Sequence, residues 1–188
     1  MFDLDRFIED CRAARAADPS HKGVREVVAR AVAEPGAVLA GVGEPDQAGI
    51  ATLHHSPELT ILNVVWAPYM TVPPHDHLMW AVIGVYTGRE DNIFWRRPEQ
   101  GAPLEAAGAK ALGVRDATPL GADIVHSVTN PIPRLTGAIH VYGGDFFCTG
   151  RTQWDPETLR AREYDAQWTM RHFAESNARW NAGVAALS

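Results

Sequence analysis

The alternation of apolar and polar residues divides the chain into a helical start, a strand-rich middle and a helical end. In residues 3–34, apolar side chains recur every three or four positions, which predicts helices at 3–17 and 20–34, with Pro35-Gly36 ending the second. From Val38 to about Phe147 this period is lost, and short apolar runs alternate with glycine and proline. These runs predict strands at 59–66, 79–86, 92–96, 124–128 and 136–142, as in an antiparallel barrel or sandwich.

The end of the chain carries the signals of a further helix. Asp155, Pro156 and Glu157 are suited to an N-cap, a first-turn proline and a first-turn acid, so we expect a helix from there to about Arg171. The chain is then one domain over residues 1–188: a helical extension (1–36), a β-barrel core (37–150) and a helical tail (151–188).

Composition fits a single domain and argues against two classes of partner. The 188 residues suffice for one sizeable core but are few for two domains. The net charge is −6, and 15 arginines and 2 lysines are scattered singly, so we expect no nucleic-acid partner. No apolar run approaches the roughly 20 residues of a membrane span, and the N-terminus lacks the basic start of a secretion signal. With only two cysteines, we expect a cytoplasmic protein without a membrane partner.

A pair of histidines within an apolar, strand-like segment is the main chemical signal. Alternate side chains of a strand share a face, so His75 and His77 can point at one metal ion while Asp76 points away. After His77, Ala81 follows at the fourth position and Gly88 seven residues later. Further along, Gly113 precedes Pro119-Leu120-Gly121, then His126 and Asn130.

This spacing resembles the two-part signature of the cupins, RmlC-like jelly-roll barrels that hold a metal in their interior. The resemblance implies a mainly β fold, an antiparallel double-stranded β-helix with the N-terminal and C-terminal helices added to it. Ala81 stands where most cupins carry a glutamate ligand. His75, His77 and His126 would then form a neutral three-imidazole site with open positions for water or substrate.

Residues 57–147 resemble more closely the thiol dioxygenases, the cysteine and 3-mercaptopropionate dioxygenases, and especially their bacterial members. The matching segments are His75-Asp76-His77, His126-Ser127-Val128-Thr129-Asn130-Pro131 and His140-Val141-Tyr142. The resemblance implies that His75, His77 and His126 hold Fe(II) and that His140 and Tyr142 lie beside it as catalytic residues.

Three positions depart from that family. Ala138 replaces its serine, no cysteine is placed to be joined to the tyrosine, and the arginine of an early strand in animal members is missing, with His54 and His55 nearest. Bacterial members place a substrate-binding arginine nine residues beyond the tyrosine, where this chain has Arg151. The resemblance therefore implies that Arg151 pairs with an anionic group of the substrate.

The implied reaction is oxidation of a small thiol, such as cysteine or 3-mercaptopropionate, to its sulfinate with O2. Three neutral imidazoles leave the full charge of a divalent metal in place, which favours an anionic ligand such as a thiolate. Zinc or another divalent metal would suit the same ligands. Two alternatives remain open: a three-histidine oxygenase that cleaves a carbon–carbon bond of a diketone-like substrate, and a metal-binding cupin that senses a ligand without transforming it. The oligomeric state is open as well, a homodimer included.

Overall fold

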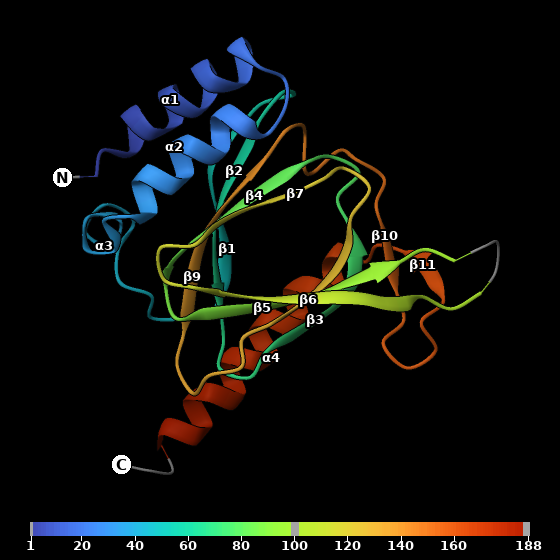
Figure 1. The fold of residues 1–188 in the computed structure, drawn as a ribbon. Coiled ribbons are helices and arrows are strands. Elements are labelled where there is room, and N and C mark those ends of the chain that lie inside the picture. Colours follow the sequence, from blue (N-terminus) through green and yellow to red (C-terminus); the bar gives the residue numbers. More distant parts are fainter. Residues whose placement is uncertain (1, 99–101, 186–188) are drawn as a thin grey trace.

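The computed structural model describes residues 2–98 and 102–185, and it is mainly β. The described residues form two antiparallel sheets, with three helices before them and one after them (Figure 1). The predicted fold class, a double-stranded β-helix barrel with helices at both ends, is confirmed. No helix in this part of the chain has both the length and the apolar character needed to cross a bilayer.

The chain passes back and forth between the two sheets. The five-stranded sheet contains, in spatial order, β1 (Gly49–His55), β2 (Thr60–Trp66), β9 (Thr136–Tyr142), β4 (Ala81–Thr87) and β7 (Ala117–Leu120). The six-stranded sheet contains β11 (Ala161–Glu163), β10 (Thr152–Trp154), β3 (Thr71–Asp76), β8 (Val125–Thr129), β5 (Arg89–Arg96) and β6 (Glu105–Gly113). Strands distant in sequence are therefore neighbours, β3 beside β8 and β2 beside β9, and this places residues near 75 against residues near 126.

Side chains of β4 and β9 alternate between two cores. Inward residues such as Ile83 and Ala138 belong to the core between the sheets, whereas Val82 and Val141 face the helices. Burying one such valine stabilises the fold by about 1.5–3 kcal/mol, so both faces of this sheet hold it in place. Gly84 allows a close approach of helix and strand, because a Cβ there would clash with Cγ1 of Val28.

The helices that cover the five-stranded sheet are α1 (Leu4–Ala17), α2 (Lys22–Val32) and α3 (Pro35–Val42) (Figure 1). The first two were predicted, but α3 lies where the sequence analysis began the barrel, so that boundary is wrong by about six residues. A proline is well tolerated in the first turn of a helix, because its missing N–H would have no partner there. Pro35 therefore separates two helices instead of ending the helical region.

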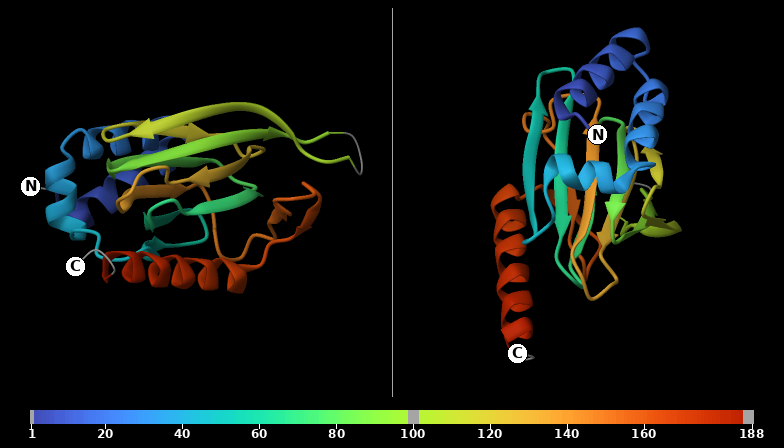
Figure 2. Two further views of the ribbon diagram at one scale, coloured as in Figure 1. Left: turned by 90° about the horizontal axis from the view of Figure 1, so that it is seen from below. Right: turned by 90° about the vertical axis from the view of Figure 1, so that its left-hand side faces the viewer.

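The predicted helix at 155–171 is also wrong. Asp155 accepts hydrogen bonds from the backbone N–H groups of Glu157 (3.1 Å) and Thr158 (2.8 Å), but the turn it caps connects β10 to β11 in a hairpin. The helix α4 (Ala166–Ala185) starts later, with Asp165 accepting from the N–H of Trp168 at 2.7 Å. It runs along the side of the barrel near β1 (Figure 2), and Phe173 stacks on Trp66.

Candidate metal centre

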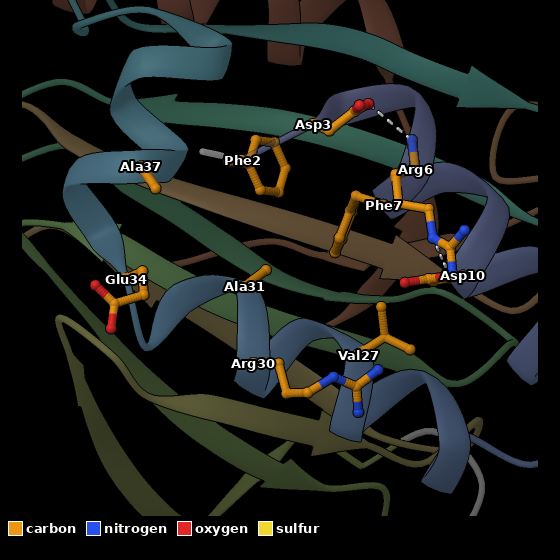
Figure 3. Close-up of a pocket in the computed structure, with 10 residues that line it drawn as sticks. All are labelled: Phe2, Asp3, Arg6, Phe7, Asp10, Val27, Arg30, Ala31, Glu34 and Ala37. Carbon is orange, nitrogen blue, oxygen red and sulfur yellow. Dashed lines mark hydrogen bonds and ion pairs between the residues drawn. The ribbon is translucent and has the colours of Figure 1, made fainter.

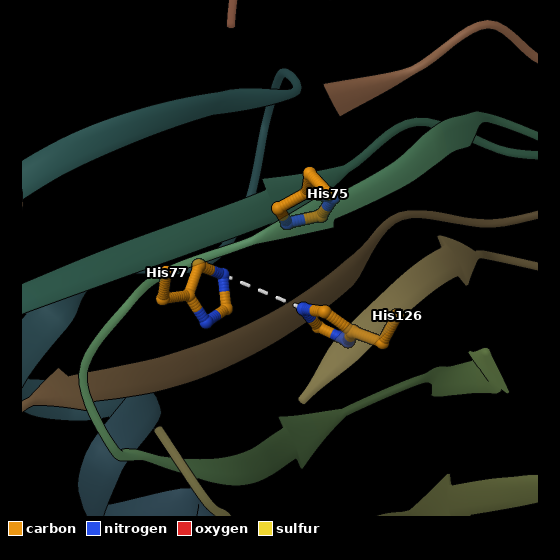
Figure 4. Close-up of side chains that lie close together, drawn as sticks. All are labelled: His75, His77 and His126. Carbon is orange, nitrogen blue, oxygen red and sulfur yellow. Dashed lines mark hydrogen bonds between the residues drawn. The ribbon is translucent and has the colours of Figure 1, made fainter. Parts of the chain in front are cut away.

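Three histidines from two neighbouring strands meet inside the barrel (Figure 4). His75 lies in β3, His77 directly follows that strand, and His126 lies opposite His75 in β8. All three are buried, and their candidate ligand atoms lie within 4.8 Å of one another. The structure thus brings together the predicted ligand set, and this group could hold a metal ion.

Hydrogen bonds fix the proton positions of two of these imidazoles. His75 Nδ1 lies 2.9 Å from the carbonyl oxygen of Pro73, which can only accept, so Nδ1 carries the proton and Nε2 keeps its lone pair. His126 Nδ1 lies 2.6 Å from Asn92 Oδ1, again an acceptor, which leaves the lone pair on Nε2. His126 Nε2 faces His77 Nε2 at 3.4 Å. Nitrogen atoms with free lone pairs therefore converge, as metal ligation requires.

Burial also keeps these imidazoles in the neutral form that binds metals. Removal from water lowers the pKa of His75 to about 4. It lowers the pKa values of His77 and His126 well below their usual range, and the neighbouring histidines lower them further. At neutral pH the three residues are thus available as ligands without prior loss of a proton.

Two residues near the histidines lie as the sequence analysis expected. Asp76 points away from the histidines: its Oδ2 accepts from Arg97 Nη2 at 2.6 Å, and its Oδ1 accepts from the N–H of Thr152 at 2.8 Å. Ala81 is fully buried in the core between the sheets and pairs with Tyr142 across β4 and β9. Among the described residues, the group that could hold a metal contains three histidines and no carboxylate.

His140 and Tyr142 share the inner face of β9. His140 Nδ1 lies 3.2 Å from the hydroxyl oxygen of Tyr142, and the Tyr142 ring centroid lies 4.9 Å from that of His77. Burial raises the pKa of Tyr142 above its usual value, so the phenol stays protonated and can donate a hydrogen bond. The pair is therefore beside the histidine cluster, and its catalytic role stays a prediction.

Arg151 immediately precedes β10 and lines the same cavity as the three histidines. Its guanidinium carbon lies 3.9 Å from the ring centroid of Phe146 and 4.0 Å from that of Tyr164, so two aromatic rings hold the cation. Its Nη1 is buried and has no hydrogen-bond partner among the described residues. The chemistry of this position suits an anionic ligand.

The cavity itself is narrow and mixed in character. Its volume is about 30 Å³, roughly the space of one water molecule. Apolar side chains from both sheets and from α4 line it together with the histidines, Tyr142 and Arg151. A ligand that fits here without moving the walls has few atoms.

Sequence reasoning missed a buried carboxylate behind this cavity. Glu90 of β5 is completely buried, with Oε2 accepting from Trp66 Nε1 at 2.8 Å and Oε1 accepting from Asn92 Nδ2 at 3.0 Å. His140 Nε2 lies 3.3 Å from Oε2, within ion-pair distance but without the alignment of a hydrogen bond. Glu90 and Asn92 are two positions apart and share one face of a strand, which was the available signal in the sequence. It was missed because the predicted strand began only at residue 92.

A larger cleft, of about 300 Å³, lies between α1, α2 and α3 (Figure 3). Phe2 and Phe7 form part of its wall, and Arg6 pairs with Asp10 at 2.9 Å at its rim. None of the six predicted site residues lines this cleft. The histidine cavity is therefore the candidate functional site.

Comparison with known proteins finds only distant likenesses, all to solved structures. No protein-family model matches the chain. A cupin superfamily protein from Desulfitobacterium hafniense is 13% identical, with a TM-score of 0.43 over 55% of this chain and 83% of that one. A double-stranded β-helix protein from Klebsiella pneumoniae is 13% identical (TM-score 0.45; 58% and 81% covered). The DMSP lyase DddQ from Ruegeria pomeroyi is 19% identical (TM-score 0.46; 60% and 54% covered). The narrower resemblance to thiol dioxygenases stays a prediction.

Proposed function

We propose that this protein is a non-haem Fe(II)-dependent dioxygenase that oxidises a small anionic thiol to its sulfinate. The observation that carries the proposal is the convergence on one narrow cavity of three neutral imidazoles, the Tyr142 hydroxyl and the Arg151 guanidinium. His75, His77 and His126 would hold the metal. Bound iron(II) would supply the redox chemistry that lets O2 react with a thiol, RSH + O2 giving RSO2H.

The charge of the site favours an anionic sulfur ligand. Three neutral imidazoles do not reduce the charge of a divalent cation, so a thiol that binds there loses its proton more readily. The buried carboxylate of Glu90 contacts Trp66, Asn92 and His140, so its charge is directed to other partners. A thiolate would therefore meet a centre whose positive charge no carboxylate of the described residues compensates directly.

Arg151 would hold the other end of the substrate. Its aromatic neighbours fix the guanidinium plane, and the unpartnered Nη1 leaves a donor for a carboxylate oxygen. The cavity of about 30 Å³ is smaller than cysteine or 3-mercaptopropionate, so side chains of its wall would have to move when such a short-chain thiol binds.

Tyr142 would donate a hydrogen bond within the cavity. Its hydroxyl is protonated because of burial, and the single proton, which faces His140 Nδ1 when the cavity holds no ligand, would turn to a ligand that enters the cavity. A positioned donor of this kind stabilises negative charge that develops during a reaction.

Oxygen consumption by the iron-loaded protein, with mass analysis of the products, tests the proposal. The substrates are 3-mercaptopropionate, cysteine, cysteamine as a thiol without a carboxylate, and acetylacetone as a diketone, with His126→Ala as the inactive control. Sulfinate formation with uptake of both oxygen atoms from ¹⁸O2 is the expected result. Cleavage of acetylacetone alone would favour the carbon–carbon-cleaving alternative, and absence of turnover with every compound would contradict the enzymatic proposal.

A further inference from the structure

Glu90 is a buried carboxylate to which neither the sequence motifs nor the proposed reaction gives a role. Its side chain is fully shielded from water, which is costly for a charge unless several donors compensate. Burial alone would raise the pKa of Glu90, but the adjacent His140 imidazole and the hydrogen-bond donors of Asn92 and Trp66 together lower it. Glu90 is thus an anion, and an ionised carboxylate can only accept hydrogen bonds.

On one side, this anion determines how Asn92 is oriented. Because Glu90 Oε1 accepts, Asn92 must present its NH2 group to Glu90, at 3.0 Å. The Asn92 carbonyl oxygen then faces His126 Nδ1, at 2.6 Å, and requires a proton there. The lone pair of His126 is consequently on Nε2, the atom that faces His77. The charge of Glu90 thus selects the tautomer of a candidate metal ligand two contacts away.

On the other side, Glu90 lies against His140. Its Oε2 is 3.3 Å from His140 Nε2 and favours a proton on that nitrogen. In the neutral imidazole, Nδ1 is then left as an acceptor for the Tyr142 hydroxyl, 3.2 Å away. Ala138, the preceding inward residue of β9, has no hydroxyl that could do this instead.

We propose that Glu90 is a positioning residue that sets both the His126 tautomer, through Asn92, and the orientation of Tyr142, through His140. The inference rests on the metal site of the proposed function, but it does not depend on which reaction that site performs. One carboxylate would therefore couple metal affinity to the placement of the hydroxyl donor.

Glu90→Gln tests this role with almost no change of shape. Trp66, held by its stacking on Phe173, keeps its N–H directed at the amide oxygen of the introduced glutamine, so the new NH2 group faces Asn92. Asn92 must then turn its carbonyl towards residue 90 and its NH2 towards His126. The His126 proton moves to Nε2, where it competes with the metal. We expect Co(II) and Zn(II) to bind to the metal-free variant roughly 10- to 100-fold more weakly than to wild type, the usual effect of losing such a partner.

The double variant Glu90→Gln, Asn92→Asp separates the two sides. The introduced glutamine can donate to the introduced aspartate, and this aspartate can accept from His126 Nδ1, so the metal affinity should return to near the wild-type value. The amide oxygen of the introduced glutamine still faces His140 Nε2 as an acceptor, so this double variant tests the Asn92 and His126 side by itself. Asp91→Asn is the matched control, because Asp91 lies on the same strand but pairs with Arg89 at the surface.

Nitrogen NMR of ¹⁵N-histidine-labelled, metal-free protein reads the tautomers directly, and its measurement on wild type does not depend on the folding of any variant. Wild type should show His126 protonated at Nδ1, and Glu90→Gln should show it protonated at Nε2. Wild-type His126 protonated at Nε2, or a folded Glu90→Gln protein with unchanged metal affinity, would overturn the inference. Failure to oxidise thiols with normal metal binding would instead contradict the proposed function and leave the role of Glu90 intact.

Discussion

The backbone N–H of Thr152 donates a hydrogen bond to Asp76 Oδ1 at 2.8 Å, so the strand that carries His75 is joined to the residue after Arg151. The second oxygen of Asp76 accepts from Arg97. The aspartate between the two histidines thus points away from the metal site and fastens the segment that brings the arginine to the cavity. The candidate metal site and the segment that carries Arg151 are connected through one buried side chain.

Replacing Asp76 should therefore disturb the segment that carries Arg151 more than it changes the amount of bound metal. Asp76→Ala leaves the N–H of Thr152 without its partner, and we expect a loss of about 1–3 kcal/mol in the free energy of unfolding. Asp76→Asn keeps a carbonyl acceptor for Thr152 and should cost less. Denaturant unfolding of both variants, with metal analysis, checks the order. Equal stability of the two variants would show that the Thr152 contact contributes nothing.

Loss of one histidine should remove most of the metal. Because no carboxylate completes the three-histidine group among the described residues, His126→Ala leaves only two ligands, and we expect little metal in protein purified without chelators. His75→Ala and His77→Ala should lose metal to a similar extent. Elemental analysis is the measurement, and His21→Ala, which lies at the start of α2, is the control. Full occupancy in His126→Ala would rule out the three-ligand site.

Tyr142→Phe should separate catalysis from metal binding. The change removes one hydroxyl and keeps the ring, so metal content should stay the same while turnover falls roughly 10- to 1000-fold, as for other positioned donors. Tyr86→Phe makes the same deletion on the outer face of β4, where the hydroxyl donates to Asn63, and should leave turnover unchanged. Equal turnover of wild type and Tyr142→Phe would make Tyr142 a packing residue.

The sequence predicted those parts of the site that repeat a local spacing. His75 and His77 are two residues apart and His140 and Tyr142 share a strand face, so strand periodicity alone pairs them. The same periodicity pairs Glu90 with Asn92, but it could not show that Glu90 is buried, because a glutamate near a strand end is usually solvated and its partners Trp66 and His140 come from other strands.

The errors in secondary structure have a common cause. A proline, or an aspartate that caps backbone N–H groups, serves turns and helix starts equally well, so the local sequence at Pro35 and Asp155 does not decide between them. Packing of the residues that follow determines whether a turn or a helix forms. The apolar residues after Pro35 cover the sheet as α3, whereas the chain after Asp155 pairs as β11.

Ala81→Glu should add a carboxylate to the centre. Position 81 faces the interior beside Tyr142, so we expect the new side chain to reach the metal ligands. An anionic ligand stabilises trivalent more than divalent iron, so we expect metal to be retained and its reduction potential to fall. Redox titration followed by absorption spectroscopy measures this, with Ala109→Glu on the exposed face of β6 as the control. Unchanged spectra would mean that residue 81 does not reach the metal.

Arg151 should determine the preference for a substrate with an anionic group. The guanidinium offers a planar, two-point contact to a carboxylate that lysine cannot reproduce, and two aromatic rings hold it in place. Arg151→Lys should therefore raise the KM for 3-mercaptopropionate, and Arg151→Ala should raise it further, while metal content and oxidation of cysteamine change little. Arg162→Ala, on the exposed strand β11, is the control. If wild type oxidises cysteamine as well as 3-mercaptopropionate and Arg151→Ala alters neither rate, the arginine does not bind substrate.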